Sequence, residues 1–471
     1  MLKSIILRKL FKEFRMKIIV KFSIWILFLF TYLNADVLKS IDKDIWLKLI
    51  EEKQYEKLDS KLQILQDKYI DDITKERTLL LALKSFENSS PKLEYMLEDW
   101  VKNKPNSIFA HTALGIYHTN LAFLSRGTDF ITKTNQKQIA KMYAHFRKAK
   151  DELQFAIDKN PKFTVPFAYM LHIHMANGND KAYKKILDKA LLLNPLSSNI
   201  RYNHLSSLQP KWGGSLKKLK KFMANTSKLY EKNRVLKRQK GYYQYVQADI
   251  LRLKKVFDKN RQIEYLNEAI KLNPNNEKYY ISRGDSYYFY FKDFQKAIDD
   301  YTKALKLSPQ NSYILGSRAK VYLKLKQYYK ALTDVNQALK YDRLAPDLLR
   351  LRGKIYYETN KENKAFQDYT DSLIYGNSSN IAHTYLGYIY YLKKNYALAS
   401  EELIKADAID DGDAQDWYYI TASQWHDRDC KFVKSAYKYK AKCDKERSCK
   451  QENLEWAIKS AEFAKANGVC K

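Results

Sequence analysis

The clearest pattern along the chain is a periodic placement of small residues in its second half. Small residues occur seven positions apart, and each of these two positions returns every 34 residues. The two series are Ala297, Ala331, Ala365 and Ala399, and Ala304, Ala338, Ser372 and Ala406. Residues seven apart lie on one face of an α-helix, where small side chains let a neighbouring helix approach closely. The pattern predicts four similar helix pairs.

The helix that precedes each of these has periodic positions of its own. Tyrosines and glycines also return every 34 residues: Tyr322, Tyr356 and Tyr390, and Gly353 and Gly387. We expect the tyrosines to fill the core beside the small residues of the partner helix. One extra residue between Gly284 and Ala297 interrupts the register of the first copy. A helix pair of this kind cannot bury its apolar face alone, so the copies are expected to stack.

A 34-residue period with glycine, tyrosine, alanine and proline in this order resembles the tetratricopeptide repeat (TPR). The resemblance implies an all-α fold, a TPR-type α-solenoid in which antiparallel helix pairs form a right-handed superhelix. Weaker copies lie upstream, with alanine and proline at matching positions: Ala156 and Ala190, Pro161 and Pro195, and Ala269 and Pro274. The low content of glycine and proline, 13 and 9 residues in 471, agrees with a mainly helical chain.

These patterns divide the chain into four parts. We expect a signal peptide at 1–35, an irregular helical, TPR-like half at 36–275, four regular repeats at 276–411, and a C-terminal helical cap with two disulfides at 412–471. The repeat pattern lapses after Asn120, and residues 125–138 are expected to form a long loop.

The N-terminal segment has the features of an export signal. Seven Lys or Arg residues precede or adjoin a 12-residue apolar run at 22–33, which is shorter than the ~20 residues that cross a bilayer. The small Ala35 suits the position before a signal-peptidase cut, and Met16 offers an alternative start. We therefore predict a periplasmic protein with a signal cleaved near Ala35. An inner-membrane anchor formed by the same segment is the alternative.

All four cysteines lie near the C-terminus, and an even number in an exported chain predicts two disulfides. Residues 431–442 and 452–466 are predicted helices, so Cys430 and Cys443 flank one helix and lie roughly 20 Å apart. That separation exceeds the limit of about 7 Å for a disulfide. In an antiparallel hairpin the pairs are then Cys443–Cys449 across the turn and Cys430–Cys470 across the open end. A zinc site is less favoured, because the close Cys-x-x-Cys pairs of such sites are absent.

The stretch LQPKWGGSLKK, residues 208–218, contains two adjacent glycines but not the spacing of a phosphate-binding loop. Pro210 blocks helix continuation, the glycines can adopt positive φ, and Ser215 can cap the following helix. We interpret the stretch as a turn with Trp212 as an apolar plug. Residues of about 145–260 also resemble a bacterial family of unknown function with a Trp-Gly-Gly-Ser turn. That resemblance brings no activity, and a role of the turn in binding stays open.

Catalytic patterns are weak. The eight histidines form neither an HExxH motif nor a partner for a GxSxG elbow, and His172 and His174 point to different faces of one helix. His426 lies in WHDRD, which we interpret as a solvated helix end. Acidic pairs such as Asp299–Asp300 and Asp410–Asp411 are expected to face solvent. We expect no enzyme, no catalytic residue, no metal site and no cofactor.

Binding is the remaining function, and the resemblance implies where it occurs. In the resembled family the first helix of each repeat lines a concave groove. Counted from Gly353 and Gly387, the inward positions are Asp285, Tyr288, Lys320, Lys324, Arg350, Lys354, Tyr357, Tyr388 and Tyr391. Where two tyrosines are adjacent, the first is expected in the core and the second in the groove. Lys320, Lys354 and Tyr388 replace the asparagine with which chaperone-binding relatives hold a peptide carboxylate, so capture of a C-terminal tail is not expected.

Net charge supplies a competing interpretation. The formal charge is +31, which suits anionic envelope polymers or lipid surfaces. Lysines are spread along the chain, however, with only short clusters at 215–222 and 233–240. We therefore predict an exported adaptor for a protein or peptide with acidic groups, and no nucleic-acid partner or small-molecule substrate. Electrostatic binding to an anionic envelope component is the alternative.

Overall fold

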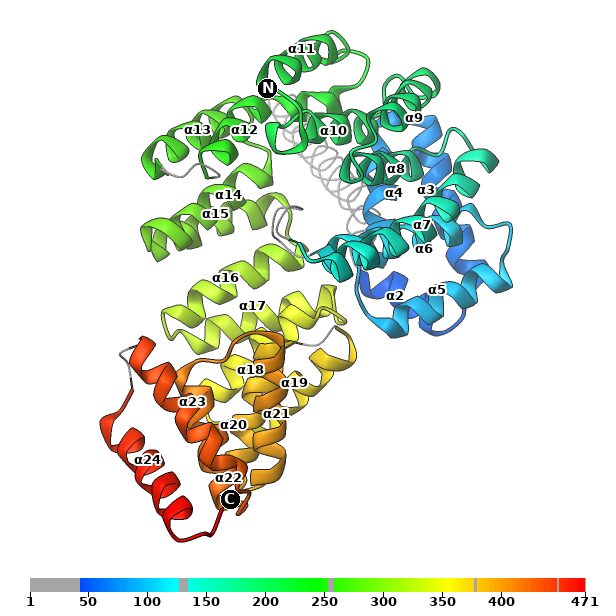
Figure 1. The fold of residues 1–471 in the computed structure, drawn as a ribbon. Helices are drawn as coiled ribbons and strands as arrows, with labels where there is room; N and C mark the ends of the chain where they lie inside the picture. Colours follow the sequence, from blue (N-terminus) through cyan, green and yellow to red (C-terminus); the bar gives the residue numbers. More distant parts are fainter. Residues whose placement is uncertain (1–42, 127–133, 253–257, 377–378, 447–448, 471) are drawn as a thin grey trace, which may run out of the picture.

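The computed structural model describes residues 43–126, 134–252, 258–376, 379–446 and 449–470. The predicted signal at 1–35 lies outside these residues. Throughout the described ranges the regular structure is helical, without a strand. The fold is therefore all-α, a TPR-type solenoid of antiparallel helix pairs (Figure 1). None of the described helices combines the length and the apolar character that a membrane span requires.

The N-terminal half contains helices of unequal length. They are α2 (Lys43–Glu51), α3 (Tyr55–Asp71), α4 (Glu76–Leu83), α5 (Pro91–Asn103), α6 (Ile108–Arg126), α7 (Gln136–Lys159), α8 (Thr164–Ala176), α9 (Asp180–Leu193), α10 (Ser198–Ser207), α11 (Leu216–Ser227), α12 (Tyr242–Arg252) and α13 (Lys259–Leu272). The expected loop at 125–138 falls between α6 and α7, and most of it lies outside the described residues.

The second half is regular. Its helices are α14 (Glu277–Ser286), α15 (Phe294–Leu307), α16 (Ser312–Lys324), α17 (Tyr328–Tyr341), α18 (Pro346–Glu358), α19 (Glu362–Ile374), α20 (Asn380–Leu392) and α21 (Tyr396–Ile409), followed by α22 (Ala414–His426), α23 (Lys431–Glu446) and α24 (Gln451–Ala466). Short 3-10 turns connect several helices, including η2 (Lys84–Phe86), η4 (Pro210–Trp212) and η5 (Arg234–Gln239).

Both series of small residues are buried, as their period predicts, and each residue is at most 2% exposed. A methyl group added at Gly353 would lie 3.2 Å from the ring of Tyr369. Tyr301 lies beside Gly284 in the same way, whereas Leu403 lies beside Gly387, and all three side chains come from the second helix of the pair. Tyr322, Tyr356 and Tyr390, which were expected in the core, are only half-buried.

A left-handed residue joins the two helices of each repeat. Non-glycine residues with positive φ recur every 34 positions: Lys292, Lys326, Asn360, Lys394 and Arg428. Because the last of these lies between α22 and α23, this pair continues the repeat register beyond residue 411. The extra residue of the first repeat forms one turn of π-helix, η6 (Tyr287–Phe291), directly before Lys292. A π-turn absorbs a one-residue insertion without shifting the helix that follows.

Buried ion pairs repeat along the array. Each pair joins an arginine of a first helix to an aspartate of the second through two hydrogen bonds of 2.6–2.9 Å: Arg283–Asp300, Arg318–Asp334 and Arg352–Asp368. Arg318 also donates to Thr302 of the preceding repeat at 2.9 Å. The expectation that Asp300 faces solvent is wrong, because its side chain is buried against Arg283. Asp299 is exposed, as are Asp410 and Asp411.

The solenoid closes on itself after one turn. Helices α2 to α17 wind round until α17 lies beside α2 (Figure 1). Arg343, after α17, pairs with Glu51 at the end of α2, and the Asn88 side chain donates to the Leu344 carbonyl at 3.5 Å. Leu344 itself is buried in the hydrophobic core of the N-terminal helices. Helices α18 to α24 extend away from this ring.

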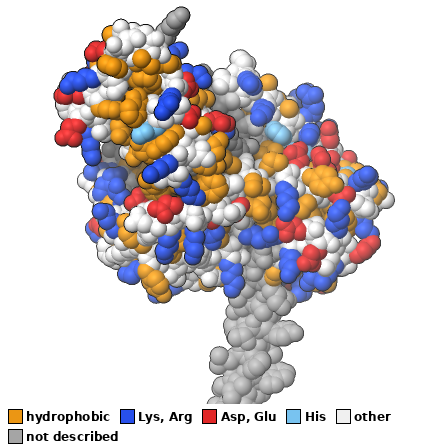
Figure 2. Space-filling model, turned by 90° about the horizontal axis from the view of Figure 1, so that it is seen from below, with side chains coloured by type: hydrophobic (Ala, Val, Ile, Leu, Met, Phe, Trp, Pro, Cys, Tyr) orange, Lys and Arg blue, Asp and Glu red, His pale blue; other side chains and the backbone are white. Residues whose placement is uncertain are grey.

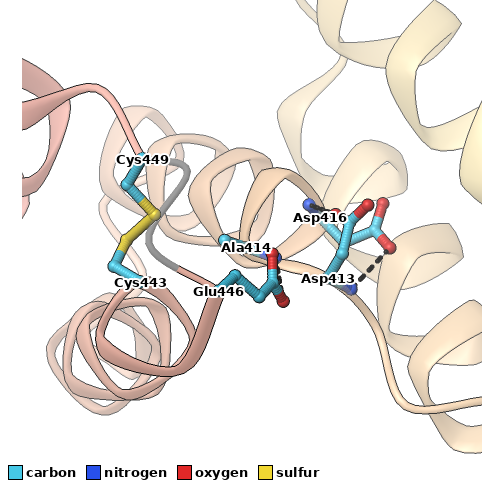
Figure 3. The surroundings of a disulfide bond; sticks show 6 residues. All are labelled: Asp413, Ala414, Asp416, Cys443, Glu446 and Cys449. Carbon is cyan, nitrogen blue, oxygen red and sulfur yellow. Dashed lines mark hydrogen bonds between the residues drawn. A yellow bond between two sulfur atoms is a disulfide. The ribbon is translucent and has the colours of Figure 1, made fainter.

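Both predicted disulfides are confirmed. Cys430 pairs with Cys470 and Cys443 with Cys449, each with Cα atoms 5.4 Å apart. The second bond joins the end of α23 to the segment just before α24. Next to it, Glu446 accepts a hydrogen bond of 3.2 Å from the Ala414 amide at the start of α22 (Figure 3). The described cysteines include no free thiol.

Candidate peptide-binding groove

Five of the nine predicted groove residues line a single hollow of about 710 Å³. They are Tyr288, Lys320, Lys324, Arg350 and Lys354. The hollow is formed mainly by α16 and α18, the first helices of two successive repeats, as the resemblance implies. The π-turn η6 supplies the aromatic side of the wall with Tyr288 and Phe289.

The hollow is basic. Six Lys or Arg residues line it against two acidic residues, Asp347 and Glu358. Arg350 is paired with Asp347. Among the residues that the structure describes, Lys320, Lys324 and Lys354 have no carboxylate within 4 Å. Unpaired ammonium groups beside aromatic rings provide attraction for an acidic group and apolar area for the chain that carries it.

Sequence reasoning missed several lining residues. Lys292 and Lys326 are the left-handed residues between paired helices, and both face this hollow. Their 34-residue interval is visible in the sequence, but only the backbone conformation shows that a turn points them to the groove side. Phe289, Phe294 and Tyr328 add further aromatic surface.

Three predicted groove residues form a separate aromatic cluster nearer the C-terminus. Tyr357 contacts Tyr385, with ring centroids 5.1 Å apart, and Tyr391 contacts Tyr419 at 4.9 Å. Tyr388 is only 8% exposed, and its hydroxyl donates to Asp416 at 2.7 Å. The prediction that Tyr388 lines the groove is therefore wrong, because this side chain ties α20 to α22 instead. Burial raises the pKa of Tyr391 to about 12, so it stays a neutral hydroxyl.

Asp285 does not line the basic hollow, although the charge of Lys320 in that hollow acts on its carboxyl. It accepts a hydrogen bond of 2.6 Å from Tyr301 and lines a smaller pocket of about 200 Å³ with Asp249 and Arg252. Burial raises the pKa of the Asp285 carboxyl, although the Tyr301 hydroxyl opposes that shift. Asp285 thus holds two helices of the first repeat together.

The Trp-Gly-Gly stretch is the predicted turn. Gly213 has φ of +81°, and a Cβ on Gly214 would lie 2.2 Å from the Leu208 carbonyl, so both positions require glycine. Ser215 caps α11 by accepting from the Lys218 amide at 3.2 Å. Trp212 is half-buried, with the Arg126 guanidinium 5.7 Å from its ring centroid.

The histidines are explained by packing. His426 is exposed at the end of α22 and stacks on Tyr396, with centroids 4.5 Å apart, which agrees with a solvated helix end. Donor atoms of Glu94, Glu98 and His118 lie within 4.8 Å of one another. There the Lys148 ammonium lies 3.5 Å from Glu94, and the His118 ring faces His145 with 3.4 Å between nitrogens. Lys148 thus offsets one of the two carboxylate charges, and His118 is in contact with His145.

Comparison with known proteins agrees with this fold. Residues 288–355 match the family model of the tetratricopeptide repeat, a range that includes all five predicted residues of the basic hollow. No curated protein sequence matches the chain.

Several solved structures are similar. A tetratricopeptide repeat protein from Parabacteroides merdae ATCC 43184 is 20% identical over 48% of this chain and 88% of its own, with a TM-score of 0.38. PilW, a widely conserved type IV pilus biogenesis factor, is 16% identical over 46% of this chain and 98% of its own, with a TM-score of 0.40. The Cut9–Hcn1 structure from the APC/C is 14% identical over 88% of both chains, with a TM-score of 0.45.

Proposed function

We propose that the tetratricopeptide repeats of this chain act as a scaffold that holds an extended acidic segment of a partner protein in the basic hollow. The observation that carries the proposal is the set of unpaired lysines, Lys320, Lys324 and Lys354, beside the aromatic wall. A hollow lined by the first helices of two successive repeats suits a segment of a partner chain that contacts both repeats. No catalytic role is assigned to any residue.

Export is part of the same proposal. It is supported by the N-terminal sequence pattern and by the two disulfides, since stable disulfides are typical of proteins in oxidising compartments. The partner would then be another exported protein or an exposed domain of a membrane protein.

Binding to an anionic envelope polymer is the second candidate. Figure 2 shows Lys and Arg side chains spread over the face in view, with hydrophobic side chains between them, rather than gathered in one patch. A spread charge favours weak, salt-sensitive attachment, whereas the hollow favours one specific segment.

Site-specific photo-crosslinking in the producing cells separates the two. Crosslinkers replace Lys324 in the hollow or Lys217, which is exposed on α11. We expect one protein to be enriched from position 324 only, through a peptide rich in Asp or Glu. Lys320→Glu with Lys354→Glu should remove that product, and Lys320→Arg with Lys354→Arg should keep it. Equal products from both positions, or adducts only with glycan or lipid, would contradict the proposal.

A further inference from the structure

A second hollow lies among the helices of the ring, and its lining residues differ from those of the basic hollow. Its volume is about 430 Å³, within the range of small-molecule sites. Helices α4, α8 and α10, the turn η5 and the start of α14 form it. Lys84 and Glu87, which follow α4, also line it and pair with each other at 3.4 Å. Leu80, Leu81, Val235 and Leu236 provide apolar surface, so the hollow is not merely a gap between charged side chains.

One carboxylate in this pocket is already neutralised. Glu277 accepts a hydrogen bond of 2.7 Å from Arg77 on α4 and lies 3.5 Å from Arg238 on η5. Burial by itself would raise the pKa of Glu277, but the two guanidinium groups hold it below its usual value. Because two arginines meet one carboxylate, a positive charge is left over.

Lys278 adds a second uncompensated charge. Its ammonium lies 4.9 Å from the ring centroid of Tyr245, 5.7 Å from that of Tyr202 and 6.0 Å from that of Tyr242. Burial by itself would lower the pKa of Lys278, and the tyrosines raise it, so the side chain stays charged. Within the described parts of the chain, Lys278 has no carboxylate within 4 Å.

Three residues that line the pocket each have a buried polar atom without a hydrogen-bond partner among the described residues. Tyr169, Asn199 and Gln239 line the pocket and are at most 5% exposed. The Tyr169 hydroxyl, the Asn199 amide nitrogen and the Gln239 amide oxygen have no hydrogen-bond partner among the described residues. Such atoms cost free energy in a folded protein, and a ligand with both donors and acceptors lowers that cost.

We propose that this pocket binds a small organic carboxylate with an apolar body and an amide-like group. The carboxylate would lie against Lys278 and Arg238, and the apolar body against the leucines of α4. Since leucine and valine side chains line part of the hollow, an organic carboxylate with an apolar body fits the site better than inorganic phosphate, which would leave this surface uncovered. The ligand would contact α4 and α14 together and thereby stabilise the closed ring.

Calorimetry and ligand-observed NMR test this with the full chain. The carboxylate probes are N-acetyl-L-leucine and other N-acetyl amino acids with apolar side chains. Each is compared with its uncharged carboxamide, and inorganic phosphate is tested as a further anion. We expect at least one carboxylate to bind, its carboxamide to bind at least about tenfold more weakly, and Lys278→Met to weaken the carboxylate by a similar factor. Lys271→Met, exposed on α13, is the matched control and should leave binding unchanged.

Three results would overturn the assignment: no carboxylate bound by the wild-type chain at millimolar concentration, binding unchanged in Lys278→Met, or binding of phosphate alone. The double variant Lys320→Glu, Lys354→Glu should leave carboxylate binding in this pocket unchanged. A failure of the pocket proposal can therefore be distinguished from a failure of the groove proposal. Arg238→Met gives a second variant if Lys278→Met does not fold, since Glu277 keeps its contact with Arg77.

Discussion

The amide of Ser198 donates a hydrogen bond of 2.7 Å to the carboxylate of Glu76, 122 residues earlier in the chain. The Ser198 hydroxyl donates to the same oxygen at 2.7 Å, and the amide of Asn199 at 3.0 Å. Glu76 is fully buried, so it caps the N-terminus of α10 from the start of α4. An anion at this position satisfies free amides and interacts favourably with the helix dipole.

Replacement of Glu76 tests how strongly α4 is held to α10. Glu76→Ala leaves these donors buried without an acceptor, so we expect a loss of about 3 kcal/mol in the free energy of unfolding. Hydrogen exchange of the α10 amides should accelerate first. Glu98→Ala, exposed on α5, is the control and should change stability little. An unchanged hydrogen-exchange rate of the α10 amides would show that Glu76 does not stabilise the start of α10.

The repeated ion pairs give a second prediction. The side chains of Arg318 and Asp334 are 19% and 8% exposed, so removing one partner leaves a buried charge. Arg318→Met should lower the free energy of unfolding by about 3 kcal/mol, and adding Asp334→Leu should restore much of that loss. Urea denaturation of the single and double variants measures both effects.

The exposed pair Lys184–Asp188, with side chains 75% and 60% exposed, is the matched control. Lys184→Met should cost well under about 1 kcal/mol. Equal effects at the buried and the exposed pair would mean that the repeated ion pairs do not hold the helices of the repeats together.

The two disulfides should differ in their contribution. Chain entropy predicts about 4 kcal/mol for Cys430–Cys470, which closes 40 residues, and about 2 kcal/mol for Cys443–Cys449, which closes 6. Thermal denaturation of the two Cys-to-Ser double variants should therefore show the larger loss for the first pair. The opposite order would indicate that the contact of Glu446 with α22 (Figure 3) dominates.

Buried neutral histidines predict instability in acid. Burial, with smaller effects of Lys148 and His145, lowers the pKa of His118 to about 3, and burial lowers that of His204 to about 4. An unfolded histidine titrates near 6.5, so between these values the unfolded chain binds more protons. The stability contribution is complete above about pH 6.5 and is lost as the pH falls.

Denaturation at several pH values checks this sign. His118→Gln should reduce the slope of unfolding free energy between pH 6.5 and 4 by up to about 1.4 kcal/mol per pH unit, the value for one proton. His426→Gln, at an exposed position, should leave the slope unchanged. A wild-type chain that gains stability as the pH falls from 6.5 to 4 would contradict the explanation.

Patterns in the local sequence were enough to predict much of this structure. The 34-residue period identified the paired helices and the buried alanines, because each repeat packs mainly on its neighbours and small residues must lie at those contacts. Helix length, together with the antiparallel arrangement of a helical hairpin, selected the cysteine pairs. The spacing of the first helices located five groove residues, although it misplaced Tyr388, since packing of α22 on α20 buries that position.

The contacts between residues far apart in the chain were decided by the tertiary structure alone. The pairing of Glu51 with Arg343, the cap of Glu76 on α10 and the pocket at Lys278 all depend on how far each repeat rotates relative to the one before. Small rotations add up over many helices, so no period in the sequence shows where one full turn ends. The sequence determined the repeating unit, and the accumulated geometry of stacking determined which distant residues meet.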